Sequence, residues 1–247
     1  MIAGSAFLPA IPLRRDRQGG GPADLPATVN GVELHSPRGV SQRARRKKMK
    51  VLGILGSPRM GGNSDILLDQ ALAGAREAGA EIEKIILSQK KISGCLDCGK
   101  CNETGVCVIK DDMGEIHSKI LEADALIHSV PVYFWAMTSQ MKAYHDRWCA
   151  FFDEQWSMQK TYRPKFSGKK IALITICGDS NISTADPIVH SFKNTSDFAG
   201  LTWVGVVQAS AGSKGDISRN EAVKKKAFDL GKKAATPQNV LGPSVNQ

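Results

Sequence analysis

The stretch that decides the fold is Gly56-Ser57-Pro58-Arg59-Met60-Gly61-Gly62-Asn63-Ser64. The apolar run 51–55 before it is typical of a buried strand, and after it apolar residues recur at helical spacing from Leu67 to Ala78. We therefore predict a tight turn from a strand into a helix. Such a turn directs free backbone N–H groups and the positive end of the helix dipole to one place, which binds anions and most often phosphate.

Side chains in this turn favour the same ligand. Ser57, Asn63 and Ser64 offer hydrogen-bond donors, and Arg59 adds positive charge. Ser64 is also a candidate for the N-cap of the helix, a purely structural role. The turn lacks the lysine of the Walker motif and the spaced glycines of the dinucleotide fingerprint. The expected ligand is therefore the phosphate of a mononucleotide-like molecule rather than ATP or a dinucleotide.

The rest of the chain alternates between strand and helix patterns. The further strands are expected at 81–87, 125–132, 170–176 and 202–209, and helices at about 112–121, 139–152, 188–198 and 220–234. Five strands separated by helices predict an α/β domain with a parallel sheet covered by helices on both faces.

The chain of 247 residues, 42% of them hydrophobic, is long enough for one such domain with extra segments. We assign the domain to residues 49–235, with a polar tail at 236–247. Residues 1–48 hold nine basic and three acidic side chains without periodicity, and we predict a disordered basic tail or a start-site artefact. A targeting or nucleic-acid role for this tail is the alternative. The remaining charge is close to balanced, so nucleic acid is not an expected partner, and no apolar run could span a membrane.

Ligands of parallel sheets bind at the carboxyl ends of the strands. The loops after the first, third and fourth strands have unusual compositions: the anion turn, the aromatic run Tyr133-Phe134-Trp135, and the small polar loop 178–185. A phosphate at the first loop and a flat ring against the second are what flavin mononucleotide (FMN) requires.

Four of the six cysteines form the pattern Cys95-x2-Cys98-x2-Cys101-x5-Cys107 within a predicted cysteine-rich loop at 94–110, the cysteine loop. Nothing indicates secretion, so we expect a cytoplasmic protein whose clustered thiols bind metal rather than form disulfides. Three thiols at this spacing with a fourth close by suit a [4Fe–4S] cluster, with zinc or metal-free reactive thiols as alternatives. Cys149 and Cys177 are interpreted as small buried apolar side chains.

These motifs together resemble the flavodoxin-like NAD(P)H-dependent FMN reductase superfamily. The resemblance rests on Gly56 to Ser64, on Pro131-Val132-Tyr133-Phe134, on Gln140-Met141-Lys142 and on Asp146-Arg147. The cysteine segment, continuing to Asp111-Asp112-Met113, resembles the iron–sulfur flavoprotein branch. The resemblance covers about residues 49–235.

The resemblance implies a three-layer sandwich with strand order 2-1-3-4-5. It implies that the FMN phosphate is held by Ser57, Arg59, Gly62, Asn63 and Ser64, and that the isoalloxazine is lined by Pro131, Val132, Tyr133, Phe134, Trp135 and Gly178. It implies that Cys95, Cys98, Cys101 and Cys107 hold a [4Fe–4S] cluster. For Asp146-Arg147 two roles are open: a surface ion pair on a helix, or a role in a dimer or at the flavin edge.

Three functions compete on this basis. The first is an iron–sulfur flavoprotein that passes electrons between FMN and a [4Fe–4S] cluster, with ferredoxin or NAD(P)H as partner and a homodimer or homotetramer as assembly. The second is an NAD(P)H-dependent FMN or quinone reductase without a cluster. The third is a zinc-binding or redox-sensing module. The histidines form no nucleophile motif, so no catalytic side chain is expected.

Overall fold

The computed structural model of the protein describes residues 48–237. The predicted basic tail lies outside the described residues except for Lys48, and so do residues 238–247 of the predicted polar tail. No helix among the described residues is both long and apolar enough to cross a membrane.

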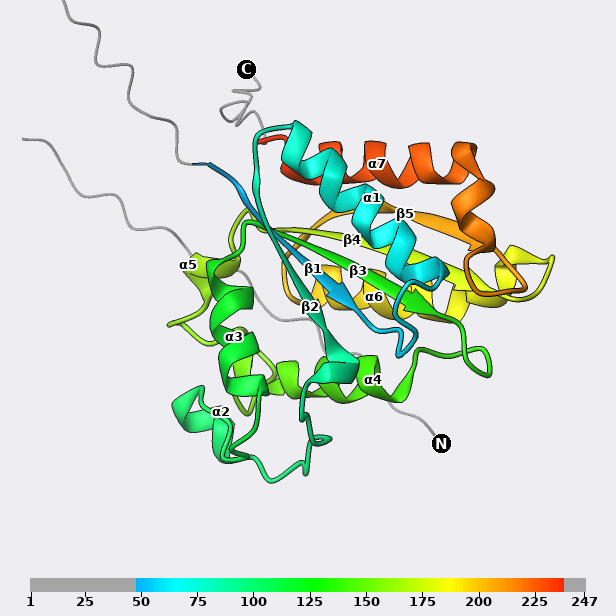
Figure 1. Cartoon of the computed structure of the whole chain (residues 1–247). Helices are drawn as coiled ribbons and strands as arrows, with labels where there is room; N and C mark the ends of the chain where they lie inside the picture. The colour runs from blue at the N-terminus through cyan, green and yellow to red at the C-terminus, as the bar shows by residue number, and fades with distance from the viewer. Residues whose placement is uncertain (1–47, 238–247) are drawn as a thin grey trace, which may run out of the picture. The chain divides into compact units, whose positions relative to one another are not determined.

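Five strands form one parallel sheet in the order β2-β1-β3-β4-β5 (Figure 1). The strands are β1 (Lys50–Leu55), β2 (Glu81–Ile86), β3 (Ala125–Pro131), β4 (Lys170–Cys177) and β5 (Thr202–Ser210). The predicted fold and strand order are confirmed. Every residue of β4 is buried, because an inner strand of a parallel sheet is covered by helices on both faces.

Helices cover the two faces of the sheet in separate layers (Figure 1). One layer contains α1 (Asn63–Glu77) and α7 (Glu221–Ala235), and the other contains α3 (Met113–Glu122), α4 (Ser139–Asp146) and α6 (Asp186–Phe198). In the first layer α1 and α7 pack so closely that a Cβ atom on Gly74 would lie 2.0 Å from the carbonyl oxygen of Phe228. Only glycine allows the two backbones to approach in this way.

The second layer has an aromatic interior around a buried histidine. His128 of β3 has its Nε2 atom 3.1 Å from the hydroxyl of Tyr144, and its ring centroid lies 4.8 Å from that of Phe192. Burial, with a smaller effect from nearby His145, lowers the pKa of His128 to about 3. The predicted inward face of the helix after β3, with Met141, Tyr144, Trp148 and Phe151, is confirmed as buried.

Several short helical elements complete the described chain, and two of them, the elements that begin at Lys100 and at Arg147, contain cysteines. They are α2 (Lys100–Thr104), α5 (Arg163–Phe166) and the 3₁₀ segments η1 (Leu87–Gln89), η2 (Arg147–Phe151), η3 (Ile182–Ala185) and η4 (Asp216–Arg219). The helix predicted for 139–152 is wrong in its second half, because α4 ends at Asp146 and the chain continues in the tighter winding of η2. The change of winding coincides with Arg147, whose side chain is held by the cysteine loop.

Candidate functional site

The predicted anion turn joins β1 to α1 and has the expected open donors. The N-cap of α1 is Gly62, and no side chain caps it. The first helical hydrogen bond runs from the N–H of Ile66 to the carbonyl of Gly62. No acceptor among the described residues receives the backbone N–H groups of Asn63, Ser64 or Asp65, so these three donors are available to an anion.

Hydrogen bonds within the anion turn stabilise its conformation. The Ser57 hydroxyl accepts from the N–H of Arg59 at 3.1 Å, and the N–H of Gly61 donates to the Oδ2 atom of Asp65 at 2.7 Å. Lys84 pairs with Asp65 from the neighbouring strand β2. Ser64 is the second helical residue, so the alternative that it caps the helix is wrong. Arg59 is exposed and makes no ion pair within the described chain.

A second loop, which the sequence analysis did not include, lies against the anion turn. The side chain of Asn63 donates to the carbonyl of Ser213 at 2.8 Å and accepts from the N–H of Ile217 at 3.2 Å. Asn63 therefore fixes the β5–α7 loop with its side chain and offers only its backbone N–H to a ligand. A Cβ atom on Gly61 would lie 4.0 Å from Cε of Lys214, so this lysine adds a second cation beside the turn.

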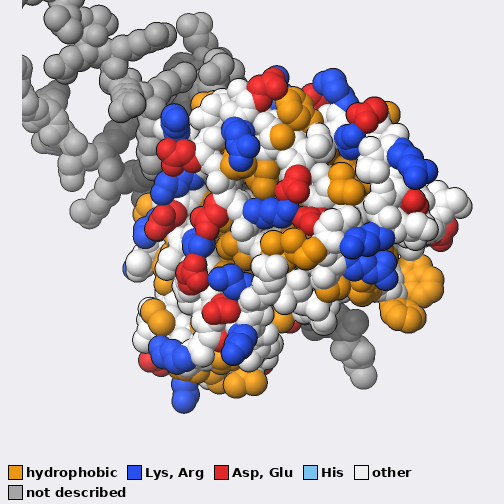
Figure 2. Space-filling view, viewed as in Figure 1, with side chains coloured by type: hydrophobic (Ala, Val, Ile, Leu, Met, Phe, Trp, Pro, Cys, Tyr) orange, Lys and Arg blue, Asp and Glu red, His pale blue; other side chains and the backbone are white. Residues whose placement is uncertain are grey.

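The aromatic run after β3 forms an exposed two-residue turn. Tyr133 and Ala136 exchange backbone hydrogen bonds of 2.9 and 3.0 Å, which places Phe134 and Trp135 at its tip. Both tip residues have positive φ, 50° and 58°, where bulky side chains are strained. Phe134 is 93% exposed and Trp135 is 64% exposed. Figure 2 shows hydrophobic side chains that protrude into solvent at one edge of the molecule. Ordinary core packing does not explain Phe134 and Trp135.

A cavity of ≈ 320 Å³ lies between this turn and the loop after β4. It is lined by Val132, Tyr133, Phe134, Trp135, Cys177, Gly178, Asp179 and Thr184. The structure thus brings together the predicted ring residues of two loops. Pro131, the last residue of β3, is in register with Ile176 of β4 and is not among the residues that line the cavity.

Thr138 joins the aromatic turn to the anion turn. Its hydroxyl donates to the carbonyl of Gly56 at 2.6 Å and accepts from the N–H of Met141, so the residue also caps α4. The contact is buried, and a Cβ atom on Gly56 would lie 2.8 Å from Cε of Met141. The open donors and the aromatic cavity are therefore held at the carboxyl edge of one sheet, as a flavin mononucleotide requires.

The cysteine loop follows β2 at the same edge of the sheet and folds over η2. Cys95, Cys98, Cys101 and Cys107 line a single small cavity of ≈ 40 Å³. Cys149 of η2 lines the same cavity, so its predicted role as an ordinary core residue is wrong, whereas Cys177 is buried as predicted. Burial raises the pKa of the Cys149 thiol to about 11, and Cys95 and Cys101 add to the shift.

The donor set of this cavity fits a thiolate-bound group by its chemistry. Five soft sulfur donors line it, and no three metal-ligating side chains of the described chain converge closely enough to hold a single ion. Burial and the nearby Cys107 raise the pKa of the Cys101 thiol.

Arg147 holds the two ends of the cysteine loop together. Its guanidinium donates to the carbonyl of Ser93 at 2.9 Å, to the carbonyl of Ile109 at 3.4 Å and to both carboxylate oxygens of Asp111. Burial alone would raise the pKa of Asp111, but hydrogen bonds from Arg147 and from two backbone N–H groups outweigh it and hold that pKa below its usual value. Cys107 is a further neighbour of the guanidinium.

The surface ion pair considered for Asp146-Arg147 is therefore wrong, whereas a role in a dimer stays a prediction. Arg147 is 2% exposed, so it cannot form a surface ion pair, and its contacts are to the cysteine loop rather than to the flavin loops. Asp146 pairs instead with Lys142 on the surface of α4.

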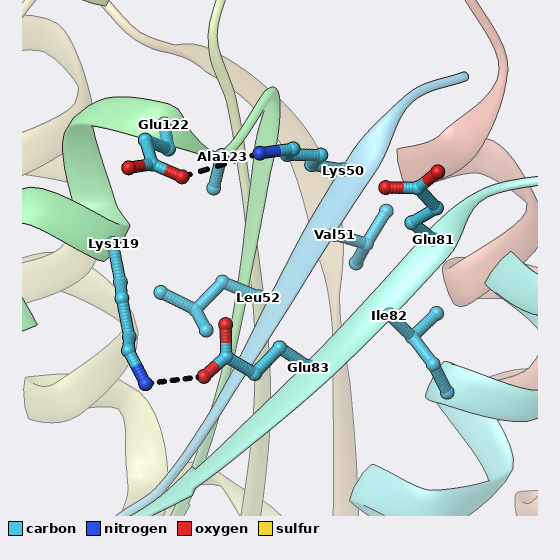
Figure 3. Close-up of a pocket in the computed structure, with 9 residues that line it drawn as sticks. All are labelled: Lys50, Val51, Leu52, Glu81, Ile82, Glu83, Lys119, Glu122 and Ala123. Atoms are coloured by element: carbon cyan, nitrogen blue, oxygen red, sulfur yellow. Dashed lines mark hydrogen bonds and ion pairs between the residues drawn. The ribbon is translucent and has the colours of Figure 1, made fainter.

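A further hollow lies between the β1–β2 edge and the end of α3, away from the carboxyl edge of the sheet (Figure 3). Its walls carry two ion pairs, Lys50 with Glu122 and Lys119 with Glu83, which Figure 3 shows facing one another. Because these charges satisfy each other, the hollow offers no converging groups to a ligand, and we do not assign it a function.

Comparison with known proteins adds independent evidence. Residues 49–216 match the family model described as NADPH-dependent FMN reductase. An iron–sulfur flavoprotein of Archaeoglobus fulgidus is 34% identical over 76% of this chain and 79% of its own length. One from Methanosarcina thermophila is 31% identical over 63% of this chain and 83% of its own.

Other relatives carry different names. A putative NAD(P)H-dependent FMN-containing oxidoreductase of Bacillus subtilis is 27% identical over 70% of this chain and 91% of its own length. Among solved structures, the Trp repressor binding protein from Bacillus subtilis aligns with a TM-score of 0.56 at 26% identity, covering 73% of this chain and 99% of its own. The NAD(P)H:quinone oxidoreductase from Methanothermobacter marburgensis aligns with a TM-score of 0.58 at 20% identity, over 75% of this chain and 98% of its own, which shows the shared fold.

Proposed function

Because this chain belongs to the NADPH-dependent FMN reductase family and is an FMN-dependent oxidoreductase, we propose that it works as an iron–sulfur flavoprotein in which FMN and a [4Fe–4S] cluster exchange electrons. The observation that carries this proposal is the shared cavity of the four loop cysteines. Four thiolates are the usual ligand set of a cubane cluster. Sequence identity of 34% and 31% with two iron–sulfur flavoproteins, over 76% and 63% of this chain, also supports the proposal.

FMN supplies two-electron and one-electron chemistry, and a [4Fe–4S] cluster supplies one-electron chemistry. The protein's own residues would bind the two groups and fix where each one lies. The N-terminus of α1 with Ser57, Gly62, Ser64 and the backbone of Asn63 would bind the phosphate, and Arg59 and Lys214 would offset its charge. Val132 to Trp135 and Gly178, which line the cavity, would contact the ring, and so would Pro131 at the end of β3. Cys95, Cys98, Cys101 and Cys107 would hold the cluster.

Exposed apolar side chains at both candidate sites indicate surfaces that contact other proteins. Phe134 at the flavin cavity and Leu96 on the cysteine loop are large apolar side chains in solvent, which is typical of contact surfaces. We propose a homodimer or homotetramer and a redox partner such as ferredoxin or NAD(P)H. The second candidate, an NAD(P)H-dependent FMN or quinone reductase without a cluster, is favoured by the open aromatic wall of the flavin cavity, which leaves the ring within reach of a small substrate.

Metal analysis of anaerobically purified protein distinguishes these candidates. We expect about four iron and four sulfide per chain, with one FMN. Cys98→Ser should lose the iron and the broad visible absorption but keep the FMN, because the flavin loops are separate from the cysteine loop. Asn102→Ser is the matched control, since Asn102 lines the same cavity without a thiol. Zinc without iron after reconstitution with iron and sulfide would contradict the cluster and favour the second candidate.

A further inference from the structure

A buried carboxylate lies in the first turn of α1, beside the predicted phosphate site. Asp65 is the third residue of the helix, and its side chain is only 6% exposed. In a capping box, an acidic side chain at this position accepts from the N–H of the N-cap residue. Here the N-cap N–H, that of Gly62, donates to the carbonyl of Arg59. Asp65 accepts instead from the N–H of Gly61 at 2.7 Å, so it stabilises the turn without occupying the N–H groups of the first helical residues.

The charge of this carboxylate opposes the binding of an anion. A negative group in the first turn cancels part of the positive potential at the end of the helix, and it repels a phosphate dianion more strongly inside the protein than in solvent. The structure places a countercharge beside it. Lys84 of β2 forms ion pairs with Asp65 and, at 2.6 Å, with Asp69 one turn further along α1.

The lysine is held in this position with its charge. Its side chain is 21% exposed, and that of Asp69 is 58% exposed, so the contact with Asp65 is the more buried of the two ion pairs. Burial alone would lower the pKa of Lys84, but hydrogen bonds to both carboxylates outweigh burial and raise that pKa above its usual value. The ammonium group is therefore charged at neutral pH.

We propose that Lys84 and Asp65 are a positioning pair for the phosphate of FMN. Lys84 neutralises Asp65 and holds its carboxylate against the Gly61 N–H, so the N-terminus of α1 presents its positive potential to the phosphate. Both residues act through the anion turn rather than by contact with the flavin. The inference deepens the proposed function, because it rests on the phosphate site at this turn, but it does not depend on the cluster.

The pair should affect flavins with a phosphate and spare those without one. Lys84→Met leaves the charge of Asp65 without its partner beside the phosphate. The dissociation constant of FMN should therefore rise by about 10-fold or more, whereas that of riboflavin should hardly change. A pair that only stabilised the fold would not distinguish the two ligands.

Flavin fluorescence titration of the full chain, freed of its flavin, measures both constants. Asp65→Asn keeps an acceptor for the Gly61 N–H but removes the charge, so this variant should bind FMN at least as tightly as the wild type. Combined with Lys84→Met, the same change should restore the affinity for FMN, and Lys84→Arg should keep it. Lys232→Met is the matched control, because Lys232 pairs with Glu77 at the opposite end of α1, and it should change neither constant.

Equal weakening of FMN and riboflavin by Lys84→Met would overturn the pair, and so would a double variant that binds FMN no better than Lys84→Met. If Lys84→Met does not fold, Asp65→Asn alone decides, since weaker binding of FMN by this variant would overturn the pair. A selective loss of FMN in Arg59→Ala without one in Lys84→Met would overturn the pair and leave the phosphate site standing. A wild type that binds FMN no more tightly than riboflavin would contradict the phosphate site, and the pair with it.

Discussion

Arg147 and Asp111 form a buried two-point ion pair, with Nη1 2.8 Å from Oδ2 and Nη2 3.1 Å from Oδ1. The side chains are 1% and 8% exposed. Asp111 begins the turn into α3, where its Oδ1 also accepts from the N–H of Met113. One pair therefore joins η2, the end of the cysteine loop and the start of a core helix.

Removing the arginine should be costly. Arg147→Met keeps the length of the side chain but leaves the Asp111 carboxylate buried without its partner, which costs about 3–5 kcal/mol in comparable buried pairs. Urea unfolding at neutral pH with saturating FMN measures the change in free energy of unfolding. Lys142→Met is the control, because it breaks the exposed pair with Asp146 on the same segment and should cost about 1 kcal/mol or less. Equal losses in both variants would contradict a structural role for the Arg147 pair.

Acid should destabilise the protein through one buried histidine, His128, and two half-buried ones, His117 and His145. Burial lowers the pKa of His117 and His145 to about 4 and that of His128 to about 3, from an ordinary value of 6.5. Below pH 6.5 the unfolded chain therefore binds protons that the folded chain does not, and the free energy of unfolding falls as the pH falls. The slope is about 1.4 kcal/mol per pH unit for each such histidine, and it levels off below the folded pKa.

His128→Gln tests this dependence directly. The variant should be less stable at pH 7, because the buried pocket around Tyr144 is disturbed, but its stability should fall less steeply between pH 6 and pH 4 by about one histidine's share. His190→Gln, which replaces an exposed histidine, is the matched substitution. Urea unfolding at several pH values gives both slopes, and parallel curves for wild type and His128→Gln would contradict the assignment.

The sheet could be predicted from the sequence because its signals are local. Strands such as β4 are buried on both faces and appear as unbroken apolar runs, and the turn at Gly61-Gly62 marks the passage into α1. Alternation of strands and helices then leaves few topologies. The candidate site residues, including the four loop cysteines, lie in contiguous motifs, so the sequence alone predicts which loops carry them.

The contacts that complete the two sites could not be predicted, because they join residues far apart in sequence. Lys214 lies beside Gly61 only because Asn63 binds the loop after β5. Cys149 resembled an ordinary core residue, because a single cysteine on an amphipathic helix pattern carries no sign of which loop will cover it. The same pattern concealed the switch to 3₁₀ winding at Arg147, which depends on the tertiary contact with Asp111.

The anion turn should discriminate between ligands with and without phosphate. We propose that Arg59 binds the phosphate, so Arg59→Ala should remove a charge-assisted hydrogen bond worth about 1.5–3 kcal/mol and raise the dissociation constant of FMN by roughly 10- to 150-fold. Riboflavin, which lacks the phosphate, should bind both proteins alike. Lys214→Ala should weaken FMN binding in the same selective way, since it lies beside the same turn.

Flavin fluorescence titration measures these affinities. Arg76→Ala is the matched control, because Arg76 lies in the last turn of α1, at the opposite end of the helix from the open N–H groups. Its replacement should change neither affinity. Equal weakening of FMN and riboflavin by Arg59→Ala would place Arg59 outside the phosphate site.

The turn at Phe134 and Trp135 should lower the free energy of unfolding of the FMN-free protein and strengthen its binding of FMN. Positive φ at both tip residues is the geometry of a type I′ turn, in which Asn-Gly is the preferred pair and bulky side chains are strained. Phe134→Asn with Trp135→Gly should therefore raise the free energy of unfolding of the FMN-free protein by about 1–3 kcal/mol. The same change removes two aromatic walls from the cavity and should increase the dissociation constant of FMN.

Trp156→Gly is the control that tests the effect of relieving backbone strain apart from any effect on flavin binding. Trp156 is also exposed and has a φ of 56°, but it lines the cysteine cavity rather than the flavin cavity. The Trp156→Gly variant should therefore have a higher free energy of unfolding than the wild type, with an unchanged affinity for FMN. Urea unfolding of the FMN-free proteins and flavin titration give both quantities. If the Asn-Gly turn is stabilised and still binds FMN as tightly as the wild type, the aromatic pair has no part in the flavin site. If it is not stabilised, the strain at the turn is relieved by contacts other than the flavin.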